Sequence, residues 1–289
     1  MRALAFLVLS VSLAAHAQTG VGVEIDDVTD NRVTAGVLTG SLELRVKLKG
    51  SGLDKATAAR VLVKEARDDK GNALSTDRLN DDFTARDVNG GLLGVSVGSP
   101  ARAAKTATIK GTVELFVPSR DPNALMKIDK ALAKLDTPLS HAKLKSAKLS
   151  LTPLSRDGHA AWLNKHKLDE AKIAEIRKEG ERRGVSAKEI ELALEMAKAF
   201  DSMDTPMPEG TVILSGSTAD FHRIYRIDVL GPDGQVIDTG NRSTSSRGDD
   251  AVMTLKPDSP PPANLALQVQ LVTAKSTMSF PFELKVNLP

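Results

Sequence analysis

The chain repeats one order of strands, turns and proline-marked loops, first from Leu42 to Ile128 and again from Thr211 to Leu288. Each copy has a glycine turn at a common offset, at Gly71 in the first and at Gly234 in the second. Each copy then passes through a Ser-Pro loop and closes with two apolar runs. A repeat of this size predicts two domains that share one fold.

Apolar and polar residues alternate along the runs of both copies. In the first copy, Leu42, Leu44, Val46 and Leu48 alternate with polar residues. This pattern places one face of a strand in a core and the other in water. Antiparallel sheets that pack face to face use strands of this kind. The sequence therefore predicts a mainly β protein with two tandem antiparallel β-sandwich domains.

One detail of the repeat does not align. Counted from the two turns, Val61 and Val63 lie one step out of phase with Tyr225 and Ile227. A shift of one residue moves side chains to the opposite face of a strand. The mismatch indicates either a β-bulge in one copy or a looser repeat.

The first residues have the layout of a secretory signal peptide. Arg2 precedes an apolar run from Ala3 to Ala15, and Ala15-His16-Ala17 offers a small-x-small cleavage site before Gln18. The run is too short for a permanent transmembrane helix, and no later segment approaches the necessary length. The signal-peptide layout therefore predicts an exported protein, periplasmic or secreted. Because the chain has no cysteine, we expect the fold to be held together by its apolar core.

These features predict an organisation into a signal peptide, two domains and a linker. Residues 1–17 form the signal peptide, 18–130 the first sandwich, 131–142 the linker and 143–289 the second sandwich. We expect residues 143–153 to be the first strand of the second sandwich. A helical hairpin at residues 157–207 is inserted after that strand.

Local signals predict the hairpin. Leu168 to Arg183 has helical composition and spacing, and Gly184 follows it as a C-terminal cap. Ser186 and Glu189 have the spacing of a capping box that begins a second helix. The turn between the two helices should therefore form from its own residues.

The second helix carries an apolar stripe that includes Ile190, Leu194 and Phe200. We expect this stripe to cover an open edge of the sandwich or to fill the groove between the two domains, because natural β proteins often cover exposed edges in this way. The alternative is that the stripe binds a partner, which makes the same three residues the candidate interaction surface. Trp162 precedes the hairpin and is expected to anchor its base.

Charge and composition argue against several classes of function. The formal net charge is +2, which does not support a nucleic-acid partner because such a partner needs a basic face. We expect no membrane span and no cofactor. The partner is expected to be a protein or a cell surface that the sequence does not identify.

The chain contains one match to a nucleophile elbow, Gly94-Val-Ser96-Val-Gly98. The elbow requires a strand that ends at the serine and a helix that begins there. Residues Leu92 to Val97 instead have the pattern of one strand, and a Ser-Pro loop follows. We therefore predict no catalytic residue, and a serine hydrolase that uses Ser96 is the alternative function.

No metal site is predicted either. The histidines do not pair at helical ligand spacing and there is no thiol, which disfavours zinc. Aspartates gather at loops, where they could supply oxygens to calcium, although aspartates that favour tight turns are the simpler interpretation. The clusters are Asp26, Asp27 and Asp30; Asp68 and Asp69; Asp81 and Asp82; Asp249 and Asp250.

The paired units resemble the immunoglobulin-like and fibronectin III-like sandwiches of exported bacterial proteins. The resemblance rests on the strand rhythm and on the turns Asp69-Lys-Gly71-Asn72 and Pro232-Asp-Gly234-Gln235. The Cys, Trp and Cys spacing of antibody domains is absent. The resemblance implies a fold and no site residue, because this fold hosts many functions. We therefore expect a non-enzymatic binding or structural module of the bacterial cell envelope.

Overall fold

The computed structural model describes residues 20–32, 40–76, 83–84, 91–202, 209–258, 260–262 and 264–288. Strands make up 43% of the structure and helices 23%, and the strands form four antiparallel sheets. The prediction of a mainly β protein is confirmed. Within the described residues, no helix has the length and apolarity needed to cross a membrane. The expected signal peptide, residues 1–17, and the pair Asp81 and Asp82 lie outside the described residues.

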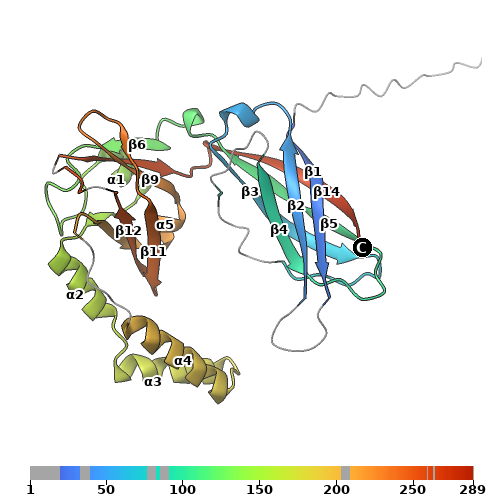
Figure 1. Ribbon diagram of the computed structural model, residues 1–289. Helices are drawn as coiled ribbons and strands as arrows, with labels where there is room; N and C mark the ends of the chain where they lie inside the picture. Colours follow the sequence, from blue (N-terminus) through green and yellow to red (C-terminus); the bar gives the residue numbers. More distant parts are fainter. Residues whose placement is uncertain are drawn as a thin grey trace, which may run out of the picture. The chain divides into compact units, whose positions relative to one another are not determined.

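The strands belong to two compact units (Figure 1). The first unit contains the residues up to Val117 and, in addition, Thr277 to Pro289. One sheet has the order β1 (Gly22–Asn31), β2 (Ser41–Lys49), β4 (Leu92–Gly98), and the other has the order β14 (Thr277–Asn287), β5 (Thr106–Phe116), β3 (Ala58–Asp68). A 3-10 helix, Leu53–Lys55, precedes β3. Both sheets contribute to one apolar core.

The alternation predicted for β2 is observed. Leu42, Leu44, Val46 and Leu48 are each no more than 3% exposed and belong to the core of the first unit. Their polar neighbours on the strand point to the other face of the sheet and are partly or fully exposed. Burial of one face of β2 holds this sheet against the core.

The second unit contains residues 118–276 and also has two sheets that share one core. The first sheet has the order β10 (Val236–Ile237), β9 (Ile224–Leu230), β13 (Ala266–Leu271), β6 (Leu125–Ile128). The second has the order β11 (Asn241–Arg247), β12 (Asp250–Lys256), β8 (Val212–Ser217), β7 (Thr152–Pro153). The helices of this unit are α1 (Ala142–Ala147), α2 (Arg156–His166), α3 (Glu170–Arg182), α4 (Ala187–Ser202) and α5 (Thr218–His222), with a 3-10 helix at Pro118–Arg120.

The strands of the two units are arranged in the same order within their sheets. The units differ in where the closing strand stands in the chain: β14 follows the other strands of the first unit, and β6 precedes the other strands of the second. β1, β2 and β4 correspond to β7, β8 and β12, while β3 and β5 correspond to β9 and β13. In the second unit, β10 pairs with β9 and β11 pairs with β12. At the corresponding strands of the first unit, β3 and β4, there are isolated bridges from Ala73 to Arg67 and from Thr76 to Val97. The helices α2, α3 and α4 fall between β7 and β8, which is the position expected for the insertion.

The closing strands are exchanged between the units. β14 pairs with β5 along its whole length, from Thr277 opposite Phe116 to Asn287 opposite Thr106, and β6 pairs with β13. Residues 118–130 therefore belong to the second unit and residues 277–289 to the first, which corrects the expected boundaries 18–130 and 143–289. Figure 1 shows the red strand β14 within the unit that also holds the blue strands β1 and β2.

Residues 143–153 are not the single strand that was expected. The helix α1 begins after His141, whose ring nitrogen accepts a hydrogen bond from the Lys143 backbone (3.3 Å), and it ends at Lys148 in the left-handed region. Leu144 is 1% exposed and belongs to the core of the second unit. The short helix buries Leu144 and leaves Lys145 and Lys148 exposed, while Lys143 Nζ donates to the carbonyls of Pro122 and Leu125. The strand in this segment is β7.

The mismatch in the repeat is explained by a β-bulge. The register of β3 against β5 shifts between Val63 and Glu65, which lies between the out-of-phase valines and the turn. The turns themselves match, because Gly71 and Gly234 both adopt positive φ, at 84° and 79°. Glycine reaches this conformation without steric cost. The bulge interpretation of the repeat is therefore supported over a looser repeat.

Candidate functional site

The turn between α3 and α4 forms from the predicted residues. The backbone N–H of Ser186 donates to Glu189 Oε2 (3.0 Å), and the backbone N–H of Glu189 donates back to Ser186 Oγ (3.3 Å). The Ser186 hydroxyl also donates to the Glu189 carboxylate, which lowers the pKa of Glu189. Gly184 has φ 75° between the two helices. This is the capping box and glycine cap that the sequence predicts.

Two of the three predicted interaction residues are buried. Ile190 is 5% exposed and Leu194 is 1% exposed, and neither belongs to the apolar core of the second unit. Ile190 lies against α3, because a Cβ atom placed on Gly180 would be 2.7 Å from Ile190 Cδ1. Ile190 therefore lies between the paired helices α3 and α4 (Figure 1). The side chain of Phe200 lies outside the described residues.

A second apolar pair on α4 remains exposed and was missed by the sequence reasoning. Leu192 is 58% exposed and Met196 is 55% exposed. They are four residues apart, so they lie on the same face of the helix, away from the buried Leu194. The signal was present in the sequence as a second i, i+4 apolar pair. We refer to Leu192 and Met196 as the α4 ridge.

An ion pair joins the two helices beside the ridge. The guanidinium of Arg177 in α3 donates to both carboxylate oxygens of Glu191 in α4, at 2.7 Å and 3.2 Å. This contact raises the pKa of Arg177 and lowers that of Glu191. Because both side chains are about half exposed, the pair fixes the geometry of the helices more than it stabilises them. The ridge is therefore presented on a defined helical surface.

The helix α2 is attached to the sheet through Asp250, at the start of β12. Lys165 Nζ and His166 Nε2 each lie 2.9 Å from Asp250 Oδ2. These two contacts, with the lysine as the larger cause, lower the pKa of Asp250. The ring of Trp162 lies 4.4 Å from that of His166 within α2, and the anchoring of a hairpin base by Trp162 stays a prediction.

His166 has a hydrogen-bond acceptor at each ring nitrogen. Nδ1 is 2.8 Å from the backbone carbonyl of Trp162, and Nε2 is 2.9 Å from the Asp250 carboxylate. A neutral imidazole carries one N–H, whereas the protonated ring donates from both nitrogens. Both ring nitrogens of His166 are therefore at hydrogen-bond distance from an oxygen, one in α2 and one in β12.

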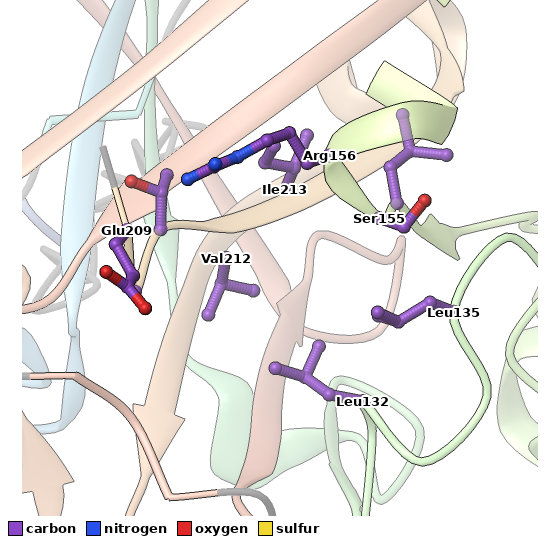
Figure 2. Close-up of a pocket in the computed structure, with 10 residues that line it drawn as sticks. Leu132, Leu135, Ser155, Arg156, Glu209, Val212 and Ile213 are labelled. Atoms are coloured by element: carbon purple, nitrogen blue, oxygen red, sulfur yellow. The ribbon is translucent and has the colours of Figure 1, made fainter. Parts of the chain in front are cut away.

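A small pocket lies where the inserted segment leaves and rejoins the sheet (Figure 2). It has a volume of about 180 Å³, and its lining includes residues that precede α2 and residues that lead into β8. Figure 2 shows Leu132 and Leu135 on one side and the charged side chains of Arg156 and Glu209 on another. Since drug-sized ligands occupy pockets of about 300 Å³ or more, this pocket is smaller than a typical site for such a ligand.

Ser96 does not have the geometry of a nucleophile elbow. It lies within β4, opposite Glu43, and the strand continues to Gly98. The next regular element is the strand β5, so no helix begins at the serine. The histidines that the structure describes, His141, His159, His166 and His222, all belong to the second unit.

The aspartate clusters differ in their placement: Asp68 lies at a turn, whereas Asp26, Asp27 and Asp30 lie within β1 and not in the loop that was expected. Asp68 accepts hydrogen bonds from the backbones of Lys70, Asn72 and Ala101 and from the side chain of Asn72, which lower its pKa to about 2. Among the described residues, no group of three or more His, Asp or Glu side chains is placed to hold a metal ion. The observed role of Asp68 is thus to fix the turn that follows β3.

Comparison with known proteins gives no assignment. No protein-family model matches the chain, and no curated protein and no solved structure is similar to it.

Proposed function

We propose that this chain is an exported, non-enzymatic binding or structural module of the bacterial cell envelope. Its two units would be immunoglobulin-like sandwiches, and the helices α3 and α4 would form a hairpin that recognises a protein partner. Two observations support the first part of the proposal: the strand orders of the two units match, and within each unit the two sheets share one apolar core. The α4 ridge supports the second.

The exposure of the α4 ridge carries the proposal. The helix packs Ile190 against α3 and buries Leu194, whereas Leu192 and Met196 remain more than half exposed. A second apolar face on a charged surface helix is typical of a contact with another protein. Met is also common at protein-binding surfaces because its side chain adapts to its neighbour.

The size of the expected effect follows from the exposed fractions. Full burial of a Leu or Met side chain contributes about 1.5–3 kcal/mol. Both residues of the ridge are a little more than half exposed, so their burial against a partner would contribute about 2 kcal/mol in total. This corresponds to a change in affinity of about 30-fold.

The experiment is quantitative capture from envelope extracts by the full mature chain. The double variant Leu192→Glu with Met196→Glu should lose about 30-fold in affinity for the captured partner while its melting temperature stays the same. The matched control changes two exposed charges on the same helix, Glu195→Gln with Lys198→Gln. Equal capture by the ridge variant and the control would refute the proposed binding surface.

A second measurement tests the non-enzymatic part of the proposal. The mature protein is incubated with an activity-based serine probe, and no labelling is expected at Ser96 because the strand geometry lacks an elbow. Labelling that disappears in Ser96→Ala would show a reactive serine. That result would replace the binding function with a hydrolase.

A further inference from the structure

The first unit is closed by a strand that arrives from the second unit. β14 follows β13 through residues 272–276 and then pairs with β5 in the first unit. β5 is itself followed by residues 117–124 and by β6, which pairs with β13. Both connecting segments have ordinary lengths for a link between neighbouring antiparallel strands. Nevertheless β6 does not pair with the strand before it, β5, and β14 does not pair with the strand before it, β13. β14 pairs with β5 and β6 pairs with β13.

The edge of β5 recognises β14 through specific side chains. Leu284 and Val286 of β14 are 8% and 0% exposed and belong to the core of the first unit. Phe282 faces Gly111 of β5, and a Cβ atom on Gly111 would lie 2.8 Å from Phe282 Cε1. The missing side chain of Gly111 therefore makes room for the aromatic ring.

The two connecting segments are held in place by buried polar contacts within the second unit. The hydroxyl of Thr273 donates to Asp121 Oδ2 (2.6 Å), and it also lies 3.0 Å from the hydroxyl of Ser276. Asp121 and Ser276 are 5% and 0% exposed. The Thr273 hydroxyl is the main cause of the lowered pKa of Asp121. These contacts fix the segment from which β14 emerges.

We propose that the β5 edge of the first unit is a strand-acceptor surface that also takes β14 from a second copy of this chain. Reciprocal exchange would give a dimer in which each first unit is closed by the β14 strand of the other copy. The contacts along the β5 edge would be the same in the monomer and in the dimer, because the same residues pair. This self-association does not depend on the α4 ridge.

The balance between the two forms is set by concentration. A strand tethered by a short segment competes at an effective concentration in the millimolar range. The dimer should therefore be scarce at about 10 μM and should rise at least tenfold in fraction as the protein approaches about 1 mM. Exchange requires the whole ladder of β14 to open, so equilibrium should be reached through a cycle of partial unfolding and refolding.

The absence of native cysteine allows a direct test. Lys110 of β5 and Glu283 of β14 are opposite each other, both are exposed, and their side chains form an ion pair at 3.4 Å. Full-length Lys110→Cys and Glu283→Cys chains, with tags of different size, are mixed, refolded together and oxidised. A disulfide between the two chains forms only where β14 of one copy lies on β5 of the other.

Two further samples define the outcome. The double variant Lys110→Cys with Glu283→Cys should give a covalent monomer at low concentration, which establishes the register of the ladder. A mixture of Lys110→Cys with Glu43→Cys is the matched control, because Glu43 is exposed on the other sheet of the first unit. Covalent heterodimer at least tenfold above this control, and rising with concentration, supports the proposal. Heterodimer equal to the control at about 1 mM, with the double variant cross-linked within one chain, overturns it.

Discussion

Replacement of Leu194 by alanine should unfold α3 and α4 without unfolding the sheets. Leu194 is 1% exposed but lies outside the core of the second unit, whereas Leu214 of β8 is 0% exposed and lies within it. A buried Leu→Ala change costs about 2–5 kcal/mol. Helices of 13 and 16 residues are marginal on their own, so this loss should exceed what holds them together.

The two variants should therefore differ in kind. Leu194→Ala should lose most of the helical circular dichroism, because α3 and α4 are the two longest helices that the structure describes. Residues 170–202 should exchange their amide hydrogens rapidly in this variant. The main thermal transition should stay unchanged. Leu214→Ala should keep the helical signal and lower the melting temperature by on the order of 10 °C.

One result would refute this reasoning. If Leu194→Ala lowers the main transition as much as Leu214→Ala does, then the stripe of α4 contributes to the core of the unit. The sequence-based expectation that the stripe covers the sheets would then hold, and the helices could not be treated as a separately stabilised pair.

Three further predictions concern charge and processing. Asp250→Asn removes the carboxylate that Lys165 and His166 contact, so amide exchange in α2 should accelerate. In the wild type the contact should persist as pH falls until Asp250 is protonated, which occurs below the usual pKa range of aspartate. An NMR titration of the Asp68 carboxylate should have its midpoint at about 2. The contribution of Asp68 to stability is therefore complete above the unfolded pKa of aspartate and is lost as pH falls through about 2. A midpoint near the usual aspartate value would contradict the described hydrogen bonds. N-terminal sequencing of the exported protein should begin at Gln18, and an intact Met1 would contradict the signal peptide.

The features that the sequence predicts well depend on neighbouring residues. Ser186 and Glu189 reach each other across one helical turn, and Gly71 and Gly234 each set a turn by their own φ. The phase error at Val63 indicated the bulge because strands have a strict period of two. Such signals carry their partner within a few residues, so they can be read without knowledge of the fold.

The exchange of closing strands depends instead on a choice between distant partners. Exposure alternates along both β6 and β14, and both β5 and β13 can pair with such a strand. Nothing local separates the two pairings, because each connecting segment is also long enough for a hairpin. The room that Gly111 leaves for Phe282 distinguishes them, and it becomes visible only when both strands are placed.

The α4 ridge was missed for a related reason. One apolar stripe accounts for the amphipathic pattern of the helix, and the exposure of Leu192 and Met196 is seen only in the structure, where Ile190 packs against α3 and Leu194 is buried. A sequence shows which residues are apolar, but the structure shows which of them stay exposed among the described residues.

The return of β14 to the first unit also determines how the chain would bear tension. The first and last described strands, β1 and β14, belong to the same unit. A pulling force applied at these two strands is borne by the first unit, and its ladder between β14 and β5 must shear before the load reaches residues 118–276. The unit that carries the helices α2, α3 and α4 is thus shielded from stretching until the first unit gives way.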